Sequence, residues 1–564
     1  MKRIIGIDVG GTNTNAALLE DGNLSATAQY PTNHRDLLSS ARVVLEEILS
    51  AIPRQAKEGL ELHLSTTLTT NAIVAGRGAP AAALIAPGPG MSPADLEFPF
   101  PVYPVGGAID HRGRETEPPD WAAVRQALGS VRQSGSGALA IVGKFSVRNP
   151  RHELEMAALA QREFPELSPV TLGHHLSGRL NFYRRVLTAC LNASVSSLQA
   201  DFVRMVRQLT EDYGIGRQIF LLKADGGTML LAESLVRPVE TTLSGPAASI
   251  MGALALGALG NQTAVTLDIG GTTTEIGVLV GGEPLGERDG AVIAGYRTLV
   301  PALFSRSIGL GGDSRVHWAA GRLQIGPERE GPPAALGGPS LTPSDAVITL
   351  DETPCGDVAK ARAALAEFGK QAGWGPEETA ERIIALFCER VIAGIGAVFD
   401  YLNGMPVYTV SEVLAPKGLK PETLIGMGGP AAFFIPKIAA GMGLASQVLP
   451  YAAAANAVGA AASRPTAAIS LRADTALGKM VVPELDEITE MRRASFFDLE
   501  KARETAREKV AAYAARAGSE SVDRPETQIS EEEVFNVVRG FYTAGRIFSL
   551  RAQIRPGVTR VTIR

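Results

Sequence analysis

One short motif occurs twice in the chain, and this duplication constrains the fold more than any other feature. The pattern Asp, any residue, Gly, Gly, Thr, any residue, Thr begins at Asp8 and again at Asp268. In each copy an apolar run precedes the aspartate, and apolar residues with strand-like spacing follow the threonines. P-loop and Rossmann phosphate loops lead into a helix instead. Each copy therefore predicts two strands joined by a glycine turn.

A second turn follows each of these hairpins, at Asp21-Gly22-Asn23 in the first copy and at Gly281-Gly282 in the second. Each unit thus predicts the same antiparallel meander. A glycine turn between two strands is more often an ordinary hairpin than a ligand site. Two copies in register indicate instead two related halves that face each other. Glycines without a Cβ atom also let backbone amides approach a phosphate closely.

The paired motifs resemble the phosphate 1 and phosphate 2 hairpins of the actin, hexokinase and Hsp70 superfamily. The resemblance implies an α/β fold with two actin-like (ribonuclease H-like) ATPase domains around a nucleotide cleft that holds ATP and Mg²⁺. It implies that Asp8 and Asp268 hold the Mg²⁺ largely through its waters, because Mg²⁺ keeps part of its hydration shell. The implied nucleotide-binding residues are Gly10, Gly11, Thr12, Asn13, Gly270, Gly271, Thr272, Thr273, Gly309, Gly311, Gly312, Gly428 and Gly429.

Length and charge agree with an enzyme of two large domains. A chain of 564 residues is too long for one ordinary domain. The net charge of -5 gives no indication of nucleic acid or of an anionic membrane as partner. The first apolar segment is interrupted by Gly6 and Asp8, so it predicts a strand and not a signal peptide. We expect a cytoplasmic protein.

Several longer motifs resemble those of the ATP-binding (A-type) subunit of the hydantoinase and oxoprolinase family, and they occur in the family's order. The segment STTLTTNAIVAGRG, from Ser65, is similar to the family's GTTxxTNA stretch. The other matches are FSVRNPRHE (145–153), YRRVLTACLNA (183–193), KADGGT (223–228), RPVETTLSGPAA (237–248), SIGLGGDS (307–314), TPSDA (342–346) and GGP (428–430). The resemblance covers roughly residues 1–465.

This family resemblance implies an ATP-dependent amidohydrolase subunit that activates a hydantoin, 5-oxoproline or related lactam by phosphorylation for ring opening. It implies Asp225 as a catalytic acid or base, and Thr66, Thr67 and Asn71 as substrate contacts. The residues alone leave open that Asp225 caps a turn and that the threonines cap a helix. A second (B-type) subunit is implied as partner, and a homo-oligomer is also left open.

Departures from the family pattern leave the substrate undetermined. Glu275 stands where the family usually has Asp, Lys223 and Ala224 differ from the usual residues before Asp225, and Asp313 replaces a Gly or Ser. One alternative is an ATP-dependent carboxylase subunit acting on a ketone. Another is a nucleotide-gated interaction protein of the actin or Hsp70 type, and a plain small-molecule kinase is the third.

We divide the chain into three regions. Residues 1–190 form an actin-like domain with the first hairpin, residues 191–465 form a second with the other hairpin and the adenosine motif, and residues 466–564 form a small C-terminal α+β region. In this last region the pattern predicts an amphipathic helix over 495–517. It also predicts a helix start at Ser530 and Glu533, which have capping-box spacing, and a hairpin around Pro556-Gly557.

The histidines give little indication of metal chemistry. His174 and His175 are adjacent, so on a strand they would point apart, and neither has an HxH or HExxH companion. We therefore expect no transition-metal site built from protein side chains alone.

Overall fold

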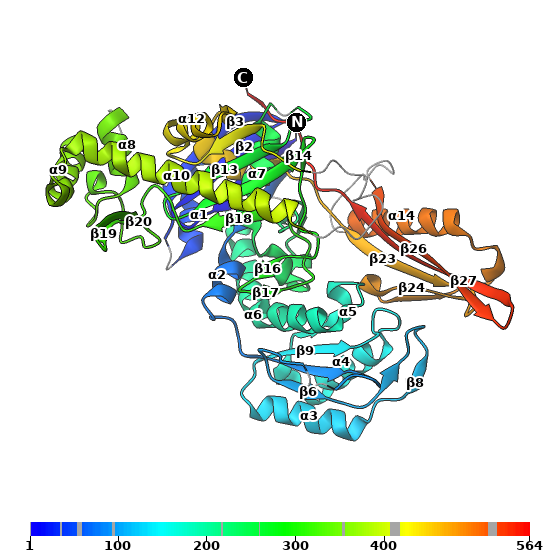
Figure 1. The fold of residues 1–564 in the computed structure, drawn as a ribbon. Coiled ribbons are helices and arrows are strands. Elements are labelled where there is room, and N and C mark those ends of the chain that lie inside the picture. Colours follow the sequence, from blue (N-terminus) through cyan, green and yellow to red (C-terminus); the bar gives the residue numbers. More distant parts are fainter. Residues whose placement is uncertain are drawn as a thin grey trace.

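The computed structural model describes residues 2–33, 36–52, 59–92, 96–215, 218–258, 260–351, 356–405, 418–516 and 527–563. These residues form two large sheets, an inserted smaller sheet and a C-terminal sheet, with helices on their faces (Figure 1). The predicted α/β fold class is confirmed.

The first large sheet contains the first copy of the motif, in the turn between β1 and β2. Its strand order is β12-β11-β4-β1-β2-β3-β28. β2 and β3 run antiparallel as a meander after β1, whereas β4 is parallel to β1 and β11 is parallel to β4. The strands are β1 (Arg3–Val9), β2 (Asn13–Glu20), β3 (Asn23–Pro31), β4 (Leu60–Thr66), β11 (Ile219–Leu222), β12 (Thr228–Leu230) and β28 (Thr562–Ile563), and α1 (Leu37–Ser50) packs on them.

The second large sheet repeats this topology strand by strand. Its order is β15-β14-β13-β21-β22, with β14 and β15 antiparallel and β21 and β22 parallel, as in β3-β2-β1-β4-β11. The predicted duplication of the meander is therefore confirmed. The strands are β13 (Ala264–Ile269), β14 (Thr274–Val280), β15 (Glu283–Pro284), β21 (Thr423–Met427) and β22 (Ala445–Val448), with β18 (Ser305–Ile308) beside β14. The main helices of this half are α8 (Pro343–Asp351), α9 (Val358–Gly369), α10 (Pro376–Asn403) and α12 (Ala431–Met442).

Two helices rich in small residues, α7 (Ser244–Leu256) and α13 (Ala455–Ala462), lie between the two large sheets. They approach so closely that a Cβ atom on Gly252 would lie 2.3 Å from the carbonyl oxygen of Ala455. Their side chains share one core with Leu19 of the first half and Leu279 of the second half. The two halves thus meet on one pair of helices.

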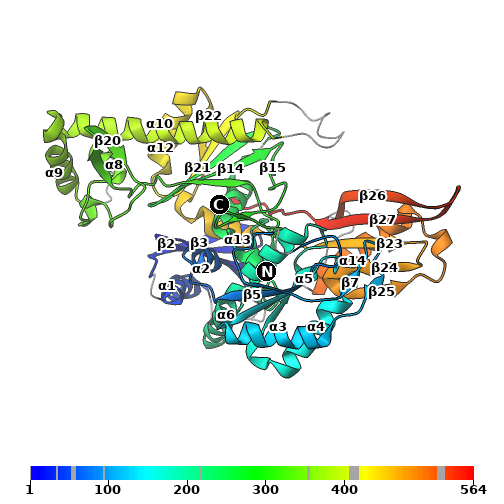
Figure 2. The same cartoon turned by 60° about the horizontal axis from the view of Figure 1, so that its bottom comes forward.

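The inserted parallel sheet follows α2 (Leu68–Val74), as Figure 2 shows at the bottom of the molecule. α3 and α4 pack on one face of it, and α6 packs on the other face and then on the first large sheet. The boundary expected between residues 190 and 191 falls inside α6. This helix contributes to the core of the inserted sheet and to the core of the first large sheet. The elements are β5 (Ala81–Ala86), β6 (Val102–Pro104), α3 (Trp121–Gln133), β9 (Ala138–Gly143), α4 (Arg151–Glu163), β10 (Val170–Leu172) and α6 (Phe182–Asp212).

The C-terminal sheet has the order β25-β24-β23-β27-β26, and α14 packs on it through a face of small residues that includes Ala502 and Ala506. The amphipathic helix is confirmed as α14 (Leu499–Arg516), and residue 517 lies outside the described residues. The strands are β23 (Ala468–Asp474), β24 (Lys479–Val482), β25 (Glu487–Glu490), β26 (Thr527–Arg539) and β27 (Tyr542–Ile554).

Two local predictions for this region are wrong. Ser530 and Glu533 lie in β26 and start no helix, because this segment pairs along its length with β27. The hairpin turns at Gly540, and beyond Pro556 the chain runs back to pair β28 with β3 of the first sheet. Within the described part of the chain, no helix combines the length and the apolar character needed to cross a membrane.

Candidate active site

The two glycine turns close in the same way. Gly10 donates its N–H to the carbonyl of Asn13 at 3.1 Å, and Gly270 donates to the carbonyl of Thr273 at 3.0 Å. The turns also face each other, since a Cβ atom on Gly271 would lie 3.0 Å from Oγ1 of Thr12. The fold therefore brings the two predicted phosphate loops together.

Asp8 ends the central strand of the first half in a buried position. Its side chain is only 2% exposed, and among the described residues its Oδ1 atom has no hydrogen-bond partner. Burial raises the pKa of Asp8 to about 6; the charge of Asp268 acts in the same direction, while Ser65 and Asn456 act against it. A buried carboxylate with a free oxygen is suited to a cation ligand, because a cation would favour its charged form.

Asp268 occupies the equivalent position in the second half but is well supplied with donors. Ser249 donates its hydroxyl to Oδ2 of Asp268 at 2.6 Å, and the Asn456 amide donates to the same oxygen at 3.0 Å. Ser249 comes from α7 and Asn456 from α13. Sequence reasoning missed both residues, although a lone Asn in the alanine-rich segment of α13 is a signal that could have found one of them.

Two further carboxyl groups lie beside the second hairpin. Glu275 is paired opposite Asp268 in the β13–β14 ladder. Burial raises the pKa of Glu275, and the charge of Asp268 adds to this. Burial also raises the pKa of Asp313, whose carboxylate accepts hydrogen bonds from Arg329 at 3.1 Å and Ser344 at 3.3 Å.

The remaining predicted nucleotide glycines lie around the second hairpin. Gly312 donates its N–H to the carbonyl of Gly270 at 2.9 Å, and a Cβ atom on Gly311 would lie 2.6 Å from the backbone of Gly271. A Cβ atom on Gly428 would lie 3.0 Å from Oδ1 of Asp268. These glycines thus support the hairpin; their contact with a nucleotide stays a prediction, as does that of Gly309 and Gly429.

Thr66, Thr67 and Asn71 lie beside the first hairpin, because Thr66 pairs with Val9 at the end of β4. Ser244, at the start of α7, donates to the carbonyl of Thr66 at 2.9 Å. Asn71 donates its amide to Thr67 Oγ1 at 3.1 Å within α2, and the Leu68 N–H reaches Oγ1 of Thr66 at 3.2 Å. These bonds organise the start of the helix, and the predicted contact with substrate stays a prediction.

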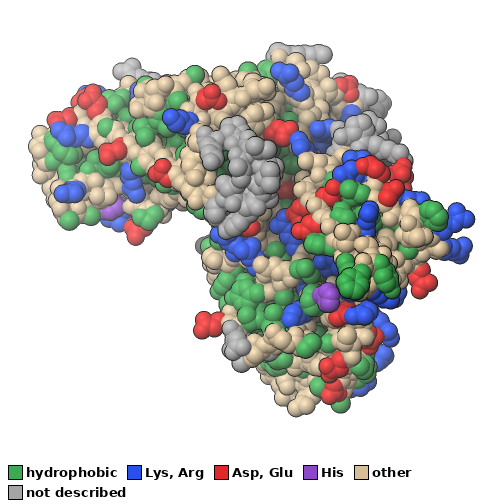
Figure 3. Space-filling model, turned by 45° about the vertical axis from the view of Figure 1, so that its right-hand side comes forward, with side chains coloured by type: hydrophobic (Ala, Val, Ile, Leu, Met, Phe, Trp, Pro, Cys, Tyr) green, Lys and Arg blue, Asp and Glu red, His purple; other side chains and the backbone are tan. Residues whose placement is uncertain are grey.

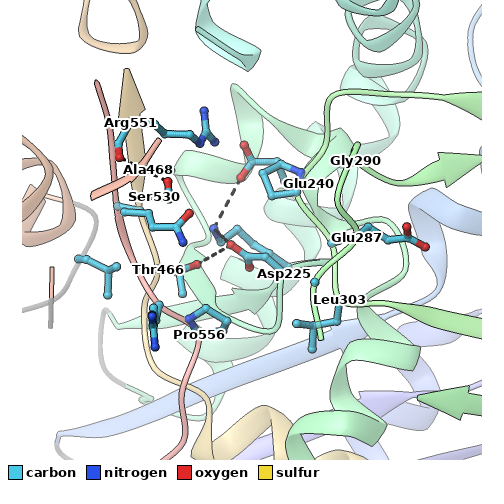
Figure 4. A pocket seen from close by; sticks show the side chains of 18 of the residues that line it. Asp225, Glu240, Glu287, Gly290, Leu303, Thr466, Ala468, Ser530, Arg551 and Pro556 are labelled. Carbon is cyan, nitrogen blue, oxygen red and sulfur yellow. Dashed lines mark hydrogen bonds and ion pairs between the residues drawn. The ribbon is translucent and has the colours of Figure 1, made fainter. Parts of the chain in front are cut away.

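Asp225 lies elsewhere, on a pocket of about 540 Å³ formed where the halves meet the C-terminal sheet. Its Oδ2 accepts from Lys223 at 3.0 Å and from the Thr466 hydroxyl at 2.9 Å, and its Oδ1 accepts the Gly227 N–H at 3.0 Å. Figure 4 shows Asp225 and Glu240 facing Ser530 and Arg551 across the pocket. Among the described residues that line it, none comes from the 66–71 segment.

The prediction that His174 and His175 point apart is wrong. They lie in the short helix α5 (Gly173–Leu176), where a helical turn replaces the expected strand. Their Nε2 atoms both meet Oδ1 of Asp486, at 2.6 Å and 2.9 Å.

Two family models match the sequence. The model described as "Hydantoinase/oxoprolinase N-terminal region" matches residues 4–164, and that described as "Hydantoinase/oxoprolinase" matches residues 185–469. The chain belongs to the hydantoinase/oxoprolinase family.

Individual proteins are similar to the chain over different lengths. Caprolactamase subunit alpha of Pseudomonas jessenii is 27% identical, over 79% of this chain and 68% of its own length. Acetophenone carboxylase gamma subunit of Aromatoleum aromaticum is 26% identical, over 61% of this chain. 5-Oxoprolinase 1 of Arabidopsis thaliana is 24% identical, over 61% of this chain. The chain spans only 53% of the carboxylase subunit and 31% of the oxoprolinase.

Two solved structures share the fold along nearly the whole chain. Nucleotide-free acetone carboxylase superposes with a TM-score of 0.72 at 17% identity, and the ATP-dependent caprolactamase of P. jessenii with 0.70 at 22% identity. Both alignments cover 99% of this chain and 88% of the other. These two likenesses show that the chain shares the fold of both structures.

Proposed function

We propose that this chain is the ATP-binding subunit of a cytoplasmic amidohydrolase that activates a cyclic amide, such as a hydantoin, 5-oxoproline or a related lactam, by phosphorylation. The observation that supports it most strongly is the pair of facing glycine turns with Asp8 and Asp268 beside them. The extent of the similarity supports the choice of a lactam, since the caprolactamase subunit aligns with 79% of the chain and the carboxylase subunit with 61%, at 27% and 26% identity.

The residues present fit an ATP-bound Mg²⁺ ion. Asp8 offers a buried oxygen that has no hydrogen-bond partner in the described part of the chain, and Asp268 is held by Ser249 and Asn456. We assign the cation to these two carboxylates. When bound, Mg²⁺ supplies charge stabilisation for phosphoryl transfer. The backbone N–H groups of the two glycine turns would add donors for the phosphate oxygens.

Phosphorylation would make the ring easier to hydrolyse, because amide resonance makes an unstrained lactam slow to react with water. In the proposed reaction the carbonyl oxygen attacks the γ-phosphorus of ATP and the bond to ADP breaks. The lactam nitrogen loses its proton, and the resulting imidate phosphate has an electrophilic carbon. Water adds to this carbon, the ring C–N bond breaks to leave an amine and an acyl phosphate, and a second water releases inorganic phosphate. Asp225, on a pocket large enough for a small ligand, is our candidate for the acid or base that handles protons there.

A second, B-type subunit would complete the enzyme, since two of the relatives carry subunit names. The tip of the β26–β27 hairpin is our candidate for its docking surface. Val538, Phe541 and Tyr542 are all exposed there, and clustered exposed apolar side chains mark protein contacts. Figure 3 turns this side of the molecule forward and shows hydrophobic side chains among charged ones. Replacing Phe541 and Tyr542 by Ser should weaken co-purification with a co-expressed B-type subunit and leave the melting temperature unchanged.

The test of the function is ADP release with a panel of 5-oxoproline, hydantoins, other lactams, and ketones with bicarbonate, with and without the B-type subunit. Stimulation by a cyclic amide supports the proposal. Stimulation by a ketone that depends on bicarbonate assigns the carboxylase reaction instead. Slow turnover that no compound changes would refute both and favour a nucleotide-gated interaction protein.

A further inference from the structure

Two adjacent histidines and an aspartate that is distant in sequence, all potential metal ligands, converge between α5 and the C-terminal sheet. The ligand atoms of His174, His175 and Asp486 all lie within 4.8 Å of one another. Oδ1 of Asp486 lies 2.6 Å from Nε2 of His174, and Nε2 of His175 lies 2.9 Å and 3.0 Å from the two Asp486 oxygens. Two imidazoles and one carboxylate are a common ligand set for divalent transition metals.

Glu153 fixes the orientation of the His174 ring. Its Oε2 atom lies 2.5 Å from Nδ1 of His174 and also accepts the His174 backbone N–H at 3.1 Å. Its Oε1 atom accepts the Gly143 N–H at 2.7 Å, so the carboxylate itself is held. Both side chains are buried. A carboxylate on the far nitrogen of a histidine is the usual outer partner of a metal-binding imidazole.

The loop that presents Asp486 is also fixed. Glu484 accepts the backbone N–H groups of Gly178 and Ser470, each at 3.0 Å, and so ties the loop both to the chain after α5 and to β23. Asp486 itself has a left-handed backbone conformation with φ of 56°. This conformation is uncommon outside glycine and is most often found for Asn and Asp. Asp486 is thus a positioned ligand rather than one member of a loose acidic surface.

The cluster lies beside the pocket that contains Asp225. His175 and Glu484 line that pocket together with Lys223 and Thr466. His174 has no exposed side-chain surface, but the side chains of His175 and Asp486 are 24% and 41% exposed. A small ligand in the pocket could therefore reach an ion held by these three residues.

We propose that Nε2 of His174, Nε2 of His175 and the Asp486 carboxylate bind one divalent transition-metal ion, of which Zn²⁺ is the type, with a coordination position open to the pocket. This site is separate from the assigned Mg²⁺ site at Asp8 and Asp268. Its existence depends neither on the identity of the substrate nor on ATP.

A proton competes with the metal at this position. Burial lowers the pKa of His174, but Glu153 and Asp486 outweigh it and raise the pKa to about 9. Without metal the cluster is therefore a carboxylate, imidazolium, carboxylate link between the inserted sheet and the C-terminal sheet. Metal binding has to release this proton. The competing interpretation is that the link is the only role of the cluster.

The test is Zn²⁺ binding by the full-length chain after chelator treatment, measured by competition with a chromogenic chelator and by metal analysis. We expect about one tightly bound Zn²⁺ per chain. Glu153→Gln should weaken binding by about 10- to 100-fold, as for other outer partners. His175→Ala and Asp486→Asn should weaken it more, and Co²⁺ in the wild-type site should give an absorption spectrum that both variants lose.

His317→Ala is the matched control, since His317 lies in β19 (Val316–Ala319), far from α5 in Figures 1 and 2. It should bind Zn²⁺ like the wild type. Absence of stoichiometric binding, or equal binding by Asp486→Asn and the wild type, would overturn the proposal and leave the proton-bridged link. Asp8→Asn should keep full Zn²⁺ binding, so that loss of ATP turnover and loss of this site are distinguishable.

Discussion

The first and second hairpins share a backbone but surround their aspartates differently. Both turns close with the same hydrogen bond, and both meanders occupy the same place in sheets of equivalent strand order. Yet Asp8 is buried with an oxygen that has no partner among the described residues, whereas Asp268 accepts from Ser249 and Asn456. The two hairpins thus share their strand topology, while Ser249 and Asn456, from the two helices between the halves, both donate to Asp268.

This difference assigns different behaviour to the two residues. Ser249 and Asn456 hold the Asp268 carboxylate in place whether or not a cation is bound. Asp8 has a pKa of about 6, so near neutral pH its charge is costly and a cation would lower that cost. Asp268 is then a cation ligand that is already held in position, and Asp8 is the ligand whose protonation changes when the cation binds.

The strongest test removes each carboxylate in turn. Asp8→Asn and Asp268→Asn should each lower ATP turnover by on the order of 1,000-fold, because each removes a charge that holds the cation on the phosphates. Steady-state ADP release measures this. Asp201→Asn, on the exposed surface of α6, is the control and should stay within twofold. Normal turnover in both hairpin variants would refute the two-carboxylate site.

The pH dependence of stability should separate the hairpins. The folded pKa of Asp8 lies above its ordinary value of 3.8, so the native state holds a proton that the unfolded state has lost between pH 4 and about 6. The contribution of Asp8 to the free energy of unfolding is therefore greatest below pH 4. It falls by about 3 kcal/mol as the pH rises from 4 through 6. Melting temperatures in the presence of chelator should show this decline in the wild type and should not show it in Asp8→Asn. The decline should be smaller in Asp268→Asn, because the charge of Asp268 helps to raise the pKa of Asp8. The same decline in all three proteins would remove Asp8 as its source.

The equivalent glycines Gly11 and Gly271 offer a smaller, steric contrast. A Cβ atom on Gly271 would lie 2.6 Å from the Asp313 carboxylate, whereas one on Gly11 would have no atom within 4 Å. Gly271→Ala should therefore destabilise the chain by about 1 to 2 kcal/mol, and Gly11→Ala by less than about 0.5 kcal/mol. Thermal unfolding without nucleotide measures both. Equal losses would mean that the Asp313 carboxylate does not crowd Gly271 as described.

The smallest effect concerns the amide of Asn456, which donates to Asp268 at 3.0 Å and also acts on the pKa of Asp8. Asn456→Ala removes an amide hydrogen bond to the charged Asp268 and should lower ATP turnover by about 10-fold. Asn403, whose amide bonds to the Leu419 carbonyl on the surface, is the matched control. Asn403→Ala should leave turnover within twofold. If Asn456→Ala behaves like the control, Asp268 does not need this donor.

The sequence predicted what local patterns encode. The two meanders follow from strand alternation around a repeated turn, and both are present in the structure. The helix start predicted at Ser530 and Glu533 is wrong. Capping-box spacing is a local pattern, and the pairing of β26 with β27 overrides it. The expected boundary at 190 lies inside α6, a helix that contributes side chains to two cores, so the division into domains stays a prediction.

For the site, the sequence located the turns but not their surroundings. Ser249 and Asn456 reach Asp268 from helices whose approach depends on glycine contacts that no spacing reveals. Likewise, His174 and Asp486 are 312 residues apart and meet only because the C-terminal sheet packs against α5. Contacts between residues so distant in sequence depend on tertiary packing, so the pattern of a single sequence cannot show them.

The return of the chain from β27 to β28 has a mechanical consequence. On its way the chain bonds to Ala462 at the end of α13, to Ala255 in α7, and through Thr562 to Gly22 in the turn before β3. The C-terminal sheet is thus connected by two neighbouring segments, from α13 to β23 and from β27 to β28, at the place where the two halves meet. A rotation of one half against the other would therefore move the C-terminal sheet, which forms one wall of the pocket at Asp225.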